Sequence, residues 1–369
     1  MRLTLFFTRN LSLQAWANQG MFDREVAIYQ ALQNKGVEVG FVTYGDRRDC
    51  AFASRLPGIK ILCNYLNLPA HRYQRWLHLL HAPWLFRSDI YKTNQTSGAD
   101  IALRVAQFWR KPLVARCGYM WSDFVAAKHG EQSSAAENAL NLEKTVFTQA
   151  QRVVVTTPLM ANDISKRMPE VAPSTVVIPN YVETDRFRPL PEIKKEFDLV
   201  FVGRLESQKN VDALLSAIAP LDVTLLLIGS GSLEKELKEK YSQLRDRVQW
   251  QGNVPNAELP QYLNRARGFI LPSHYEGHPK ALIEAMSCGL PVIGTNVVGT
   301  REILVDRENG LLCETTPESI RQGIQTLLSQ PEHSLKLGEN AREYVLKHFS
   351  LSQIVQQELE TLTQAQNRQ

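Results

Sequence analysis

Two stretches in the second half of the sequence place charged residues next to glycine, in a pattern suited to an anionic ligand. The first is FVGRLESQKN at 201–210, where Arg204 and Lys209 follow a run of apolar residues. Arginine binds phosphate oxygens as a fork and lysine binds them as a point charge, so together they suit a diphosphate. Gly203 precedes both cations and lets the backbone turn. Cations in loops are usually only solvated, so this stretch alone is not specific.

The second stretch is SHYEGHPKALIEAM at 273–286, which passes from an expected strand into an expected helix. The amides of Lys280 and Ala281 would lie at the helix N-terminus, where free N–H groups bind phosphate. Glu276 and Glu284 add carboxylates, which accept paired hydrogen bonds from the vicinal hydroxyls of a ribose or a hexose. A capped surface helix with a solvated glutamate explains the same pattern equally well.

The sequence predicts no metal site. His274 and His278 flank the acidic motif, but no third ligand lies near them in the sequence. The chain contains no Asp-x-Asp pair, and its five cysteines are widely spaced without a Cys-x-x-Cys motif. This cysteine usage indicates neither a disulfide framework nor a zinc site, and it favours a reducing, cytoplasmic setting.

Short apolar or β-branched runs alternate with longer helical patterns along the whole chain. Such alternation predicts parallel sheets that are covered by helices on both faces. The expected strands are 3–7, 37–43, 59–62, 90–93, 112–116, 152–156 and 175–178, then 198–203, 223–228, 247–250, 268–271 and 291–294. The expected helices are 22–35, 97–109, 134–150, 158–168, 208–219, 232–244, 256–266 and 280–288. The sequence therefore predicts an α/β protein with two doubly wound domains.

A proline-rich segment at 178–191 interrupts the periodicity and marks the expected domain boundary. From about residue 331 the pattern is helical without intervening strands, and Ser350 or Ser352 would cap a last helix. The expected organisation is an N-terminal domain at 1–178, a C-terminal domain at 179–348, and a helix at 349–369 that packs back on the N-terminal domain.

The spaced motifs of the second half resemble the donor site of the retaining GT-B glycosyltransferases, glycosyltransferase family four. The motifs that carry the resemblance are Gly203-Arg204 with Lys209, and Glu276 and Glu284 with seven residues between them. Further similarity lies in the linker-like Ile178-Pro179-Asn180 and Asp185-Arg186-Phe187, and in the strand-like stretches 288–293 and 309–312. The match covers roughly residues 177–313, whereas residues 1–176 share only the general layout.

The resemblance implies a GT-B fold, with two Rossmann-like domains that face a central cleft. It implies that Arg204 and Lys209 bind the donor diphosphate and that Glu276 binds the transferred sugar near its anomeric carbon. Glu284 would hold the ribose. The other donor-binding residues that it implies are Gly203, Gly20, Gly277, His278, Lys280 and Ala281. Positive side chains in place of a divalent metal would then stabilise the leaving diphosphate.

The first half departs from the family pattern at one position. Family members commonly place a histidine after the strand expected at 112–116, and this chain has none there. The resemblance suggests Arg116, Tyr119 and Asp123 for the acceptor or sugar side of the site instead. Gly20 ends a long loop after the first strand and would still offer amides to the donor phosphate.

Charge is unevenly divided along the chain. Residues 1–178 carry a net charge of +8 and the remainder carries −4. Segment 71–87 concentrates arginine, tryptophan and leucine, with a second patch at 107–111, as is typical of an interfacial helix on anionic lipid. An ordinary amphipathic helix that packs on the sheet is the alternative. Nucleic-acid binding is not expected, because no recognised module accompanies the charge.

We therefore expect a metal-independent, retaining hexosyltransferase that needs no cofactor. It would move a hexose from a UDP- or GDP-linked sugar to a glycan or lipid-linked acceptor, in polysaccharide or cell-envelope glycan biosynthesis. The expected location is the cytoplasm, peripheral to the inner face of the membrane through segment 71–87. No apolar run approaches the ~20 residues of a spanning helix. The alternatives are a GT-B phosphorylase, a nucleotide-sugar epimerase, or a non-catalytic partner subunit.

Overall fold

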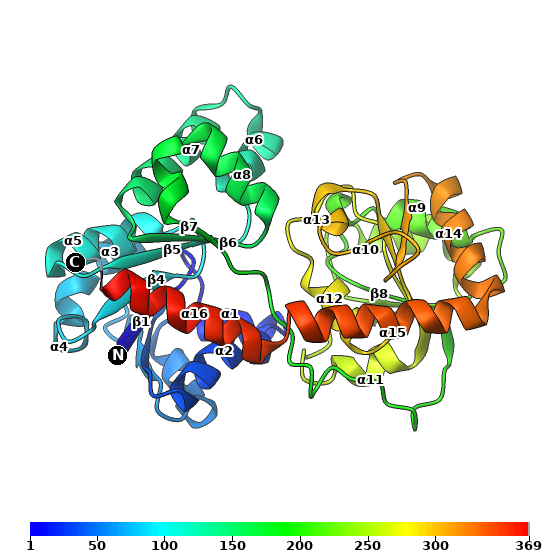
Figure 1. Cartoon of the computed structure of the whole chain (residues 1–369), viewed down its shortest axis with the longest axis horizontal. Helices are drawn as coiled ribbons and strands as arrows, with labels where there is room; N and C mark the ends of the chain where they lie inside the picture. The colour runs from blue at the N-terminus through cyan, green and yellow to red at the C-terminus, as the bar shows by residue number, and fades with distance from the viewer. Residues whose placement is uncertain (368–369) are drawn as a thin grey trace. The chain divides into compact units, whose positions relative to one another are not determined.

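The computed structural model describes residues 1–367 and divides the chain into two compact units (Figure 1). Unit 1 comprises Met1–Pro179 together with the C-terminal segment from Ile354, and unit 2 comprises Asn180–Gln353. Each unit contains one parallel sheet with helices on both faces, so the predicted α/β class with two doubly wound sheets is confirmed.

The sheet of unit 1 has seven parallel strands in the order β3-β2-β1-β4-β5-β6-β7. They are β1 Arg2–Phe6, β2 Glu38–Val42, β3 Lys60–Leu62, β4 Ile90–Thr93, β5 Leu113–Cys117, β6 Arg152–Val155 and β7 Thr175–Val177. The helices are α1 Leu13–Asn18, α2 Phe22–Asn34, α3 Ala70–Leu80, α4 Ala82–Leu85, α5 Ala99–Trp109, α6 Trp121–His129, α7 Ser134–Gln149, α8 Pro158–Arg167 and α16 Leu351–Gln366, with 3-10 helices η1 Arg47–Arg55 and η2 Pro169–Ser174.

The strands of this sheet are buried on both faces because helices cover both. Alternate residues of β4 show this, since Tyr91 packs under α3 and α5 whereas Lys92 faces α2 and α16. The red helix α16 accordingly lies along the sheet of unit 1 in Figure 1. Lys92 donates from Nζ to Oε2 of Glu358 in α16 at 2.6 Å, and both side chains are fully buried. This ion pair attaches the C-terminal helix to the sheet.

The sheet of unit 2 has six parallel strands in the order β10-β9-β8-β11-β12-β13. They are β8 Phe197–Val202, β9 Leu225–Ile228, β10 Val248–Gly252, β11 Ala266–Leu271, β12 Val292–Thr295 and β13 Leu311–Cys313. The helices are α9 Val211–Ile218, α10 Glu234–Lys240, α11 Leu259–Asn264, α12 Lys280–Ser287, α13 Val298–Arg301, α14 Pro317–Ser329 and α15 Pro331–His348, with 3-10 helices η3 Ser207–Lys209 and η4 Ser242–Leu244.

Helices α9 and α14 of unit 2 differ from the sequence expectation, each for a local reason, and the short α13 was not predicted either. The helix expected over 208–219 begins only at Val211, because Asn210 adopts a left-handed conformation with φ 51° after the short η3. Helix α14 was not predicted, although its start carries a clear signal. Thr316 accepts a hydrogen bond from the amide of Ser319 at 3.4 Å and Pro317 occupies the first turn, where proline is well tolerated.

Candidate functional site

The predicted donor-binding residues gather at the carboxyl edge of the unit 2 sheet. Strands β8 and β11 are neighbours and run parallel, so the segments that follow them leave the sheet side by side. We call these segments the β8 loop (203–210) and the β11 loop (272–279). In open α/β sheets, ligands bind at this edge of the strands.

The central contact of the site is an ion pair between the two loops. Lys209 donates from Nζ to Oε1 of Glu276 at 2.5 Å, and only 15% of the lysine side chain and 6% of the glutamate side chain are exposed. The hydroxyl of Ser273 donates to the same carboxylate oxygen at 2.6 Å. The structure thus brings together a cation and a carboxylate from two predicted motifs that are 67 residues apart.

Three further hydrogen bonds fasten the β8 loop to the β11 loop. The amide of His274 donates to the carbonyl of Gln208 at 2.9 Å, and the Gln208 side chain donates to the carbonyl of Tyr275 at 3.0 Å. Asn210 donates from Nδ2 to the carbonyl of Pro272 at 3.0 Å. Gln208 and Asn210 were not singled out from the sequence, because nothing local indicates which carbonyls their amides will reach.

Arg204 lies at the exposed side of the same edge. Its guanidinium donates from Nη2 to Oε1 of Gln208 at 3.3 Å, and its side chain is exposed. A long and weakly held contact of this kind leaves the guanidinium accessible to an anion from solvent.

The N-terminus of α12 completes the edge. Pro279 precedes the helix and caps it with no side-chain hydrogen bond. The amides of Lys280 and Ala281 lie in the first turn of α12, at the positive end of the helix dipole. His278 is buried just before this turn, where its ring packs on Phe349 at 4.9 Å. Asn180 holds the backbone there by donating to the His278 carbonyl at 2.7 Å.

Glu284 lies one turn into α12 and has surroundings unlike those of Glu276. It is 1% exposed, and its Oε1 accepts a hydrogen bond from Nδ2 of Asn256 at 2.9 Å. Asn256, which follows β10, is itself buried and was missed in the sequence. A polar side chain in a loop is an ordinary surface feature in sequence, and only the packing of the loop against α12 shows its partner.

Two glycines allow backbone segments to approach closely at this edge. Gly229 has φ 128°, and a Cβ there would lie 1.9 Å from the carbonyl oxygen of Gly203. Gly299, at the start of α13, would place a Cβ 2.0 Å from the carbonyl oxygen of Gly277. Neither position accepts a side chain without moving the loop that it touches. Gly229 therefore packs the glycine-rich turn after β9 onto the β8 loop.

The carboxylate of Glu206 further fixes that turn. It accepts hydrogen bonds from the amide and the hydroxyl of Ser232 at 3.0 and 2.7 Å. These bonds hold the pKa of Glu206 below its usual value, the backbone bond contributing most. Glu206 therefore stays ionised and serves to position the loop.

The remaining predicted residues belong to unit 1. Gly20 lies between α1 and α2 with φ 69°, and its amide donates to the carbonyl of Ala17. Arg116, on β5, lies 3.8 Å from the buried Glu358 carboxylate. Asp123 accepts from both terminal nitrogens of Arg167 at 2.7 and 3.2 Å. Of the three residues suggested for the acceptor side, Arg116 and Asp123 are thus already engaged in ion pairs.

Tyr119 follows β5 and differs from its two neighbours in being part of an aromatic cluster. Its ring lies 6.4 Å from that of Trp121 and 5.7 Å from that of Phe124, and the last two rings stack at 5.5 Å. Tyr119 is 38% exposed and Phe124 is 36% exposed. The cluster presents an aromatic surface near the carboxyl end of β5.

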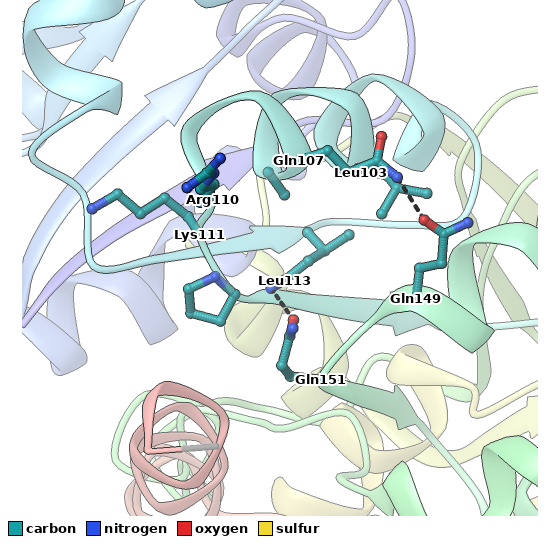
Figure 2. A pocket seen from close by; sticks show the side chains of 9 residues that line it. Leu103, Gln107, Arg110, Lys111, Leu113, Gln149 and Gln151 are labelled. Atoms are coloured by element: carbon teal, nitrogen blue, oxygen red, sulfur yellow. Dashed lines mark hydrogen bonds between the residues drawn. The ribbon is translucent and has the colours of Figure 1, made fainter. Parts of the chain in front are cut away.

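Two surface hollows lie elsewhere in unit 1, where β5 begins and where α3 and α5 end. The larger, of about 340 Å³, is shown in Figure 2, where the side chains of Arg110 and Lys111 lie at one side. Its opposite side is closed by a 2.5 Å hydrogen bond from Gln107 to Gln149. The second hollow, of about 290 Å³, is lined by Arg75, Trp76, His78, Arg104 and Phe108.

Neither a metal cluster nor a spanning helix is found in the part of the chain that the structure describes. Over residues 1–367, no three His, Cys, Asp or Glu side chains are grouped so that they could hold a metal ion. Over the same residues, every helix is too short or too polar to cross a bilayer.

Comparison with known families and proteins agrees with this architecture. The model described as Glycosyltransferase Family 4 matches residues 26–186, and the model described as Glycosyl transferases group 1 matches residues 182–344. An uncharacterised glycosyltransferase of Methanocaldococcus jannaschii is 29% identical over 232 residues, which cover 62% of this chain. The match spans 64% of that protein, just under two thirds of its length.

Solved structures share the fold over nearly the full chain. Sucrose-phosphate synthase from Thermosynechococcus elongatus superposes with a TM-score of 0.81 at 22% identity, covering 99% of this chain and 98% of that one. Anabaena HepE in complex with UDP-glucose superposes with a TM-score of 0.77 at 19% identity, covering 98% and 99%. At these identities the similarity establishes the fold.

Proposed function

Because the chain belongs to the GT-B glycosyltransferases, we propose that it transfers a hexose from a nucleoside-diphosphate sugar to an acceptor. The acceptor class is a glycan or a lipid-linked glycan of polysaccharide or cell-envelope biosynthesis, and the configuration of the transferred sugar is retained. The observation that carries the proposal is the Lys209–Glu276 pair, which lies beside Arg204 and α12 at the carboxyl edge of the unit 2 sheet.

The donor diphosphate binds where positive charge gathers without a metal. Arg204 offers an accessible guanidinium, Lys209 offers an ammonium that is already held in place, and the first turn of α12 offers amides. As the bond to the anomeric carbon breaks, negative charge grows on the departing diphosphate. Cations and dipoles that are in position beforehand stabilise that charge without reorganisation. The UDP-glucose bound to HepE supports a UDP-linked donor.

Glu276 holds the transferred sugar. Both of its hydrogen bonds within the described chain are made by Oε1, with Lys209 and Ser273 as donors. The other oxygen, Oε2, is left to accept from a sugar hydroxyl. Because the same carboxylate fixes Lys209, it sets the distance between the sugar and the cation that binds the diphosphate. Glu284, held by Asn256, binds the ribose hydroxyls.

The acceptor binds on unit 1 at the aromatic cluster of Tyr119, Trp121 and Phe124. Exposed aromatic rings suit the apolar faces of sugar rings. Arg116 and Asp123 are held in ion pairs with Glu358 and Arg167, so we do not assign them to acceptor binding.

A second surface of unit 1 binds the membrane on which a lipid-linked acceptor resides. Five aromatic rings, which we call the aromatic ridge, follow one another at centroid distances of 4.6 to 6.5 Å; they are Trp76, His78, Phe108, Trp109 and Phe86. Trp76, Phe108 and Phe86 are 47%, 54% and 61% exposed. Cations flank the ridge, which suits peripheral binding to anionic lipid at the inner face of the cytoplasmic membrane.

The test is a product analysis with labelled UDP- and GDP-sugars against a panel of glycan and lipid-linked acceptors. We expect a new glycoside with the donor's anomeric configuration, and we expect Arg204→Ala and Glu276→Ala to lower the rate by about 100-fold or more. Glu239→Ala, an exposed residue of α10, is the matched control and keeps the full rate.

Three outcomes would contradict the proposal. Epimerised nucleotide sugar formed without any acceptor would indicate an epimerase, and sugar phosphate formed from a glycan would indicate a phosphorylase. Nucleotide binding, seen as a rise in melting temperature, without turnover on any acceptor would indicate a non-catalytic subunit.

A further inference from the structure

Two cysteines of unit 1 lie side by side, although they are 13 residues apart in the sequence. The Sγ atoms of Cys50 and Cys63 are 3.5 Å apart. Cys50 belongs to η1 and is exposed, whereas Cys63 follows β3 and is 2% exposed. The other three cysteines, Cys117, Cys288 and Cys313, are buried in other elements.

The backbone holds the two thiols in this position. Asp46 caps η1 by accepting from the amide of Arg48 at 2.9 Å, which fixes the start of the 3-10 helix. The amide of Asn64, next to Cys63, donates to the carbonyl of Gly45 at 2.8 Å. The entry to η1 is therefore fastened to the exit of β3. A disulfide needs the sulfur atoms about 2.05 Å apart, so a movement of roughly 1.5 Å would join them.

The two thiols have unequal access to solvent, and this gives them different roles. Cys50 can meet a reagent in solution. Burial and the contact with Cys50 raise the pKa of Cys63 to about 12, so this thiol is protonated and is shielded from direct attack. An accessible thiol beside a second cysteine that can displace its adduct is the arrangement of reversible redox sites.

We propose that Cys50 and Cys63 form a modification site that undergoes reversible thiol–disulfide exchange with a small-molecule disulfide of the glutathione type. Cys50, as thiolate, attacks one sulfur of that disulfide, whose S–S bond breaks and releases one thiolate. Cys63 then attacks the Cys50 sulfur, and the second small thiol leaves with the Cys63 proton. The two protein thiols lose two electrons and two protons, and the small disulfide gains them as two thiols. Excess small thiol reverses both steps.

The disulfide would form at η1, whose Asp49 binds the start of α1 in the connection after β1. Asp49, adjacent to Cys50, is 1% exposed and accepts from the hydroxyl of Thr43 at 2.6 Å. Its carboxylate also accepts from the amides of Leu13 and Gln14 at 3.3 and 3.2 Å, at the start of α1. A disulfide at Cys50 fixes η1 on β3 and thereby fixes the carboxylate that holds α1. Oxidation therefore rigidifies the connection that leads to Gly20.

The test starts from the full chain in its reduced, native state. The chain is incubated with oxidised glutathione, free thiols are alkylated under denaturing conditions, and the peptides are mapped by mass spectrometry. We expect a Cys50–Cys63 cross-link, lighter by two hydrogen atoms, with the other three cysteines alkylated. In Cys63→Ser we expect a lasting glutathione adduct on Cys50, and in Cys50→Ser no reaction at Cys63. Cys313→Ser, which removes a buried thiol in unit 2, should cross-link as the unaltered chain does.

A lasting glutathione adduct on Cys50 in the unaltered chain, or full alkylation of both thiols, would overturn the proposal. Because the cross-link is read in the unaltered chain, a variant that fails to fold does not remove the test. The measurement needs no glycosyl donor or acceptor, so its outcome is independent of the proposed glycosyl transfer.

A second readout follows the structural effect. In the oxidised chain we expect slower hydrogen exchange at the amides of Leu13 and Gln14, and a melting temperature of unit 1 that is higher by about 5 °C. Both changes should disappear on reduction with dithiothreitol. Unchanged hydrogen exchange at these amides in a fully cross-linked sample would show that the disulfide does not restrain the start of α1.

Discussion

His81 shows how a single buried side chain makes unit 1 sensitive to acid. Its Nε2 lies 2.9 Å from the hydroxyl of Tyr73, and the residue is 5% exposed. Burial, with a smaller effect of Lys60, lowers the pKa of His81 to about 4. A histidine in an unfolded chain has a pKa near 6.5, so below that pH the unfolded chain binds a proton that the folded chain does not.

We therefore predict that His81 makes the chain less stable as the pH falls from about 6.5 towards 4. By linkage, this residue alone costs about 2 kcal/mol of unfolding free energy between pH 7.5 and pH 5. His81→Gln should lose that part of the pH dependence, as measured by urea denaturation at the two pH values. His71→Gln, a surface histidine at the start of α3, is the control. Equal pH dependence in His81→Gln and the unaltered chain would refute the prediction.

At the scale of elements, the contact between α13 and the β11 loop depends on Gly299. A Cβ at this position would lie 2.0 Å from the carbonyl oxygen of Gly277 and 2.5 Å from that of Glu276. We predict that Gly299→Ala displaces the β11 loop, destabilises unit 2 by about 1–3 kcal/mol and weakens nucleotide binding. Calorimetric titration with UDP and GDP measures the affinity, and thermal unfolding measures the stability.

The matched control for Gly299 is Gly323→Ala in α14. A Cβ there would lie 3.4 Å from its nearest neighbour, which is an ordinary contact. In a helix interior, alanine stabilises the fold by about 0.5–1 kcal/mol relative to glycine. This variant should bind nucleotide normally and should be equally or more stable. Normal binding in Gly299→Ala as well would mean that the close approach of α13 does not position the donor loop.

The attachment of α16 depends on the buried pair of Lys92 and Glu358. Burial lowers the pKa of Lys92 and Glu358 counteracts that shift, so each group relies on the other. We predict that Lys92→Met or Glu358→Leu alone costs about 3–5 kcal/mol. The first leaves the buried Glu358 carboxylate with only its longer contact to Arg116, and the second leaves the buried Lys92 ammonium without a counter-ion. The double variant should recover most of that loss.

Urea denaturation of the four proteins in this cycle measures the coupling between Lys92 and Glu358. Lys336→Met, an exposed lysine of α15, serves as the surface control and should have no measurable effect. Additive losses in the double variant would show that the two residues act separately.

Strands could be predicted well from the sequence, because they depend on the local pattern of apolar residues. Side-chain partners that are distant in the sequence could not. The LLLI run of β9 is apolar throughout and β6 is apolar after its first residue, as is typical of strands in a covered parallel sheet, so the sheets could be predicted. The partner of Glu284 could not, because Asn256 reaches it only through the packing of another loop. The same holds for Lys92 and Glu358, which are 266 residues apart.

The predicted donor residues illustrate the same division. Spacing indicated that Lys209 and Glu276 lie at one sheet edge, since parallel strands end together. It did not indicate that the two side chains pair directly, because that distance depends on how η3 and the β11 loop are bonded to each other. The roles of these residues in catalysis stay predictions.

At the scale of the whole molecule, the excess of positive charge in the first half of the chain includes the segment that carries the aromatic ridge. Residues 69–112 contain seven Lys and Arg but only two Asp and Glu, and both acids are already engaged. The amide of Arg2 donates to Asp89, and Arg9 pairs with Asp100. The aromatic ridge thus lies in a region with excess positive charge.

We predict that the full chain floats with vesicles that contain phosphatidylglycerol, and that it does so less at high salt. Phe86→Ala with Phe108→Ala should reduce the bound fraction several-fold, because both rings are exposed on the ridge. Arg110→Ala with Lys111→Ala should remove the preference for anionic lipid. Leu335→Ala changes an exposed apolar residue in unit 2 and should bind normally. Equal flotation of all variants, or none with the unaltered chain, would exclude the ridge as a membrane surface.

The position of α16 in the sequence has a consequence for how the protein is made. Unit 2 is continuous along the chain, but α16 is separated from the rest of unit 1 by all of unit 2. During translation, Lys92 and the β4 surface around it leave the ribosome long before Glu358 exists. The nascent chain must therefore carry a sheet that lacks one of its covering helices, with a cation that lacks its counter-ion, while the 174 residues of unit 2 are synthesised. Unit 1 can therefore reach its final packing only after all of unit 2 has been synthesised, although its strands are made first.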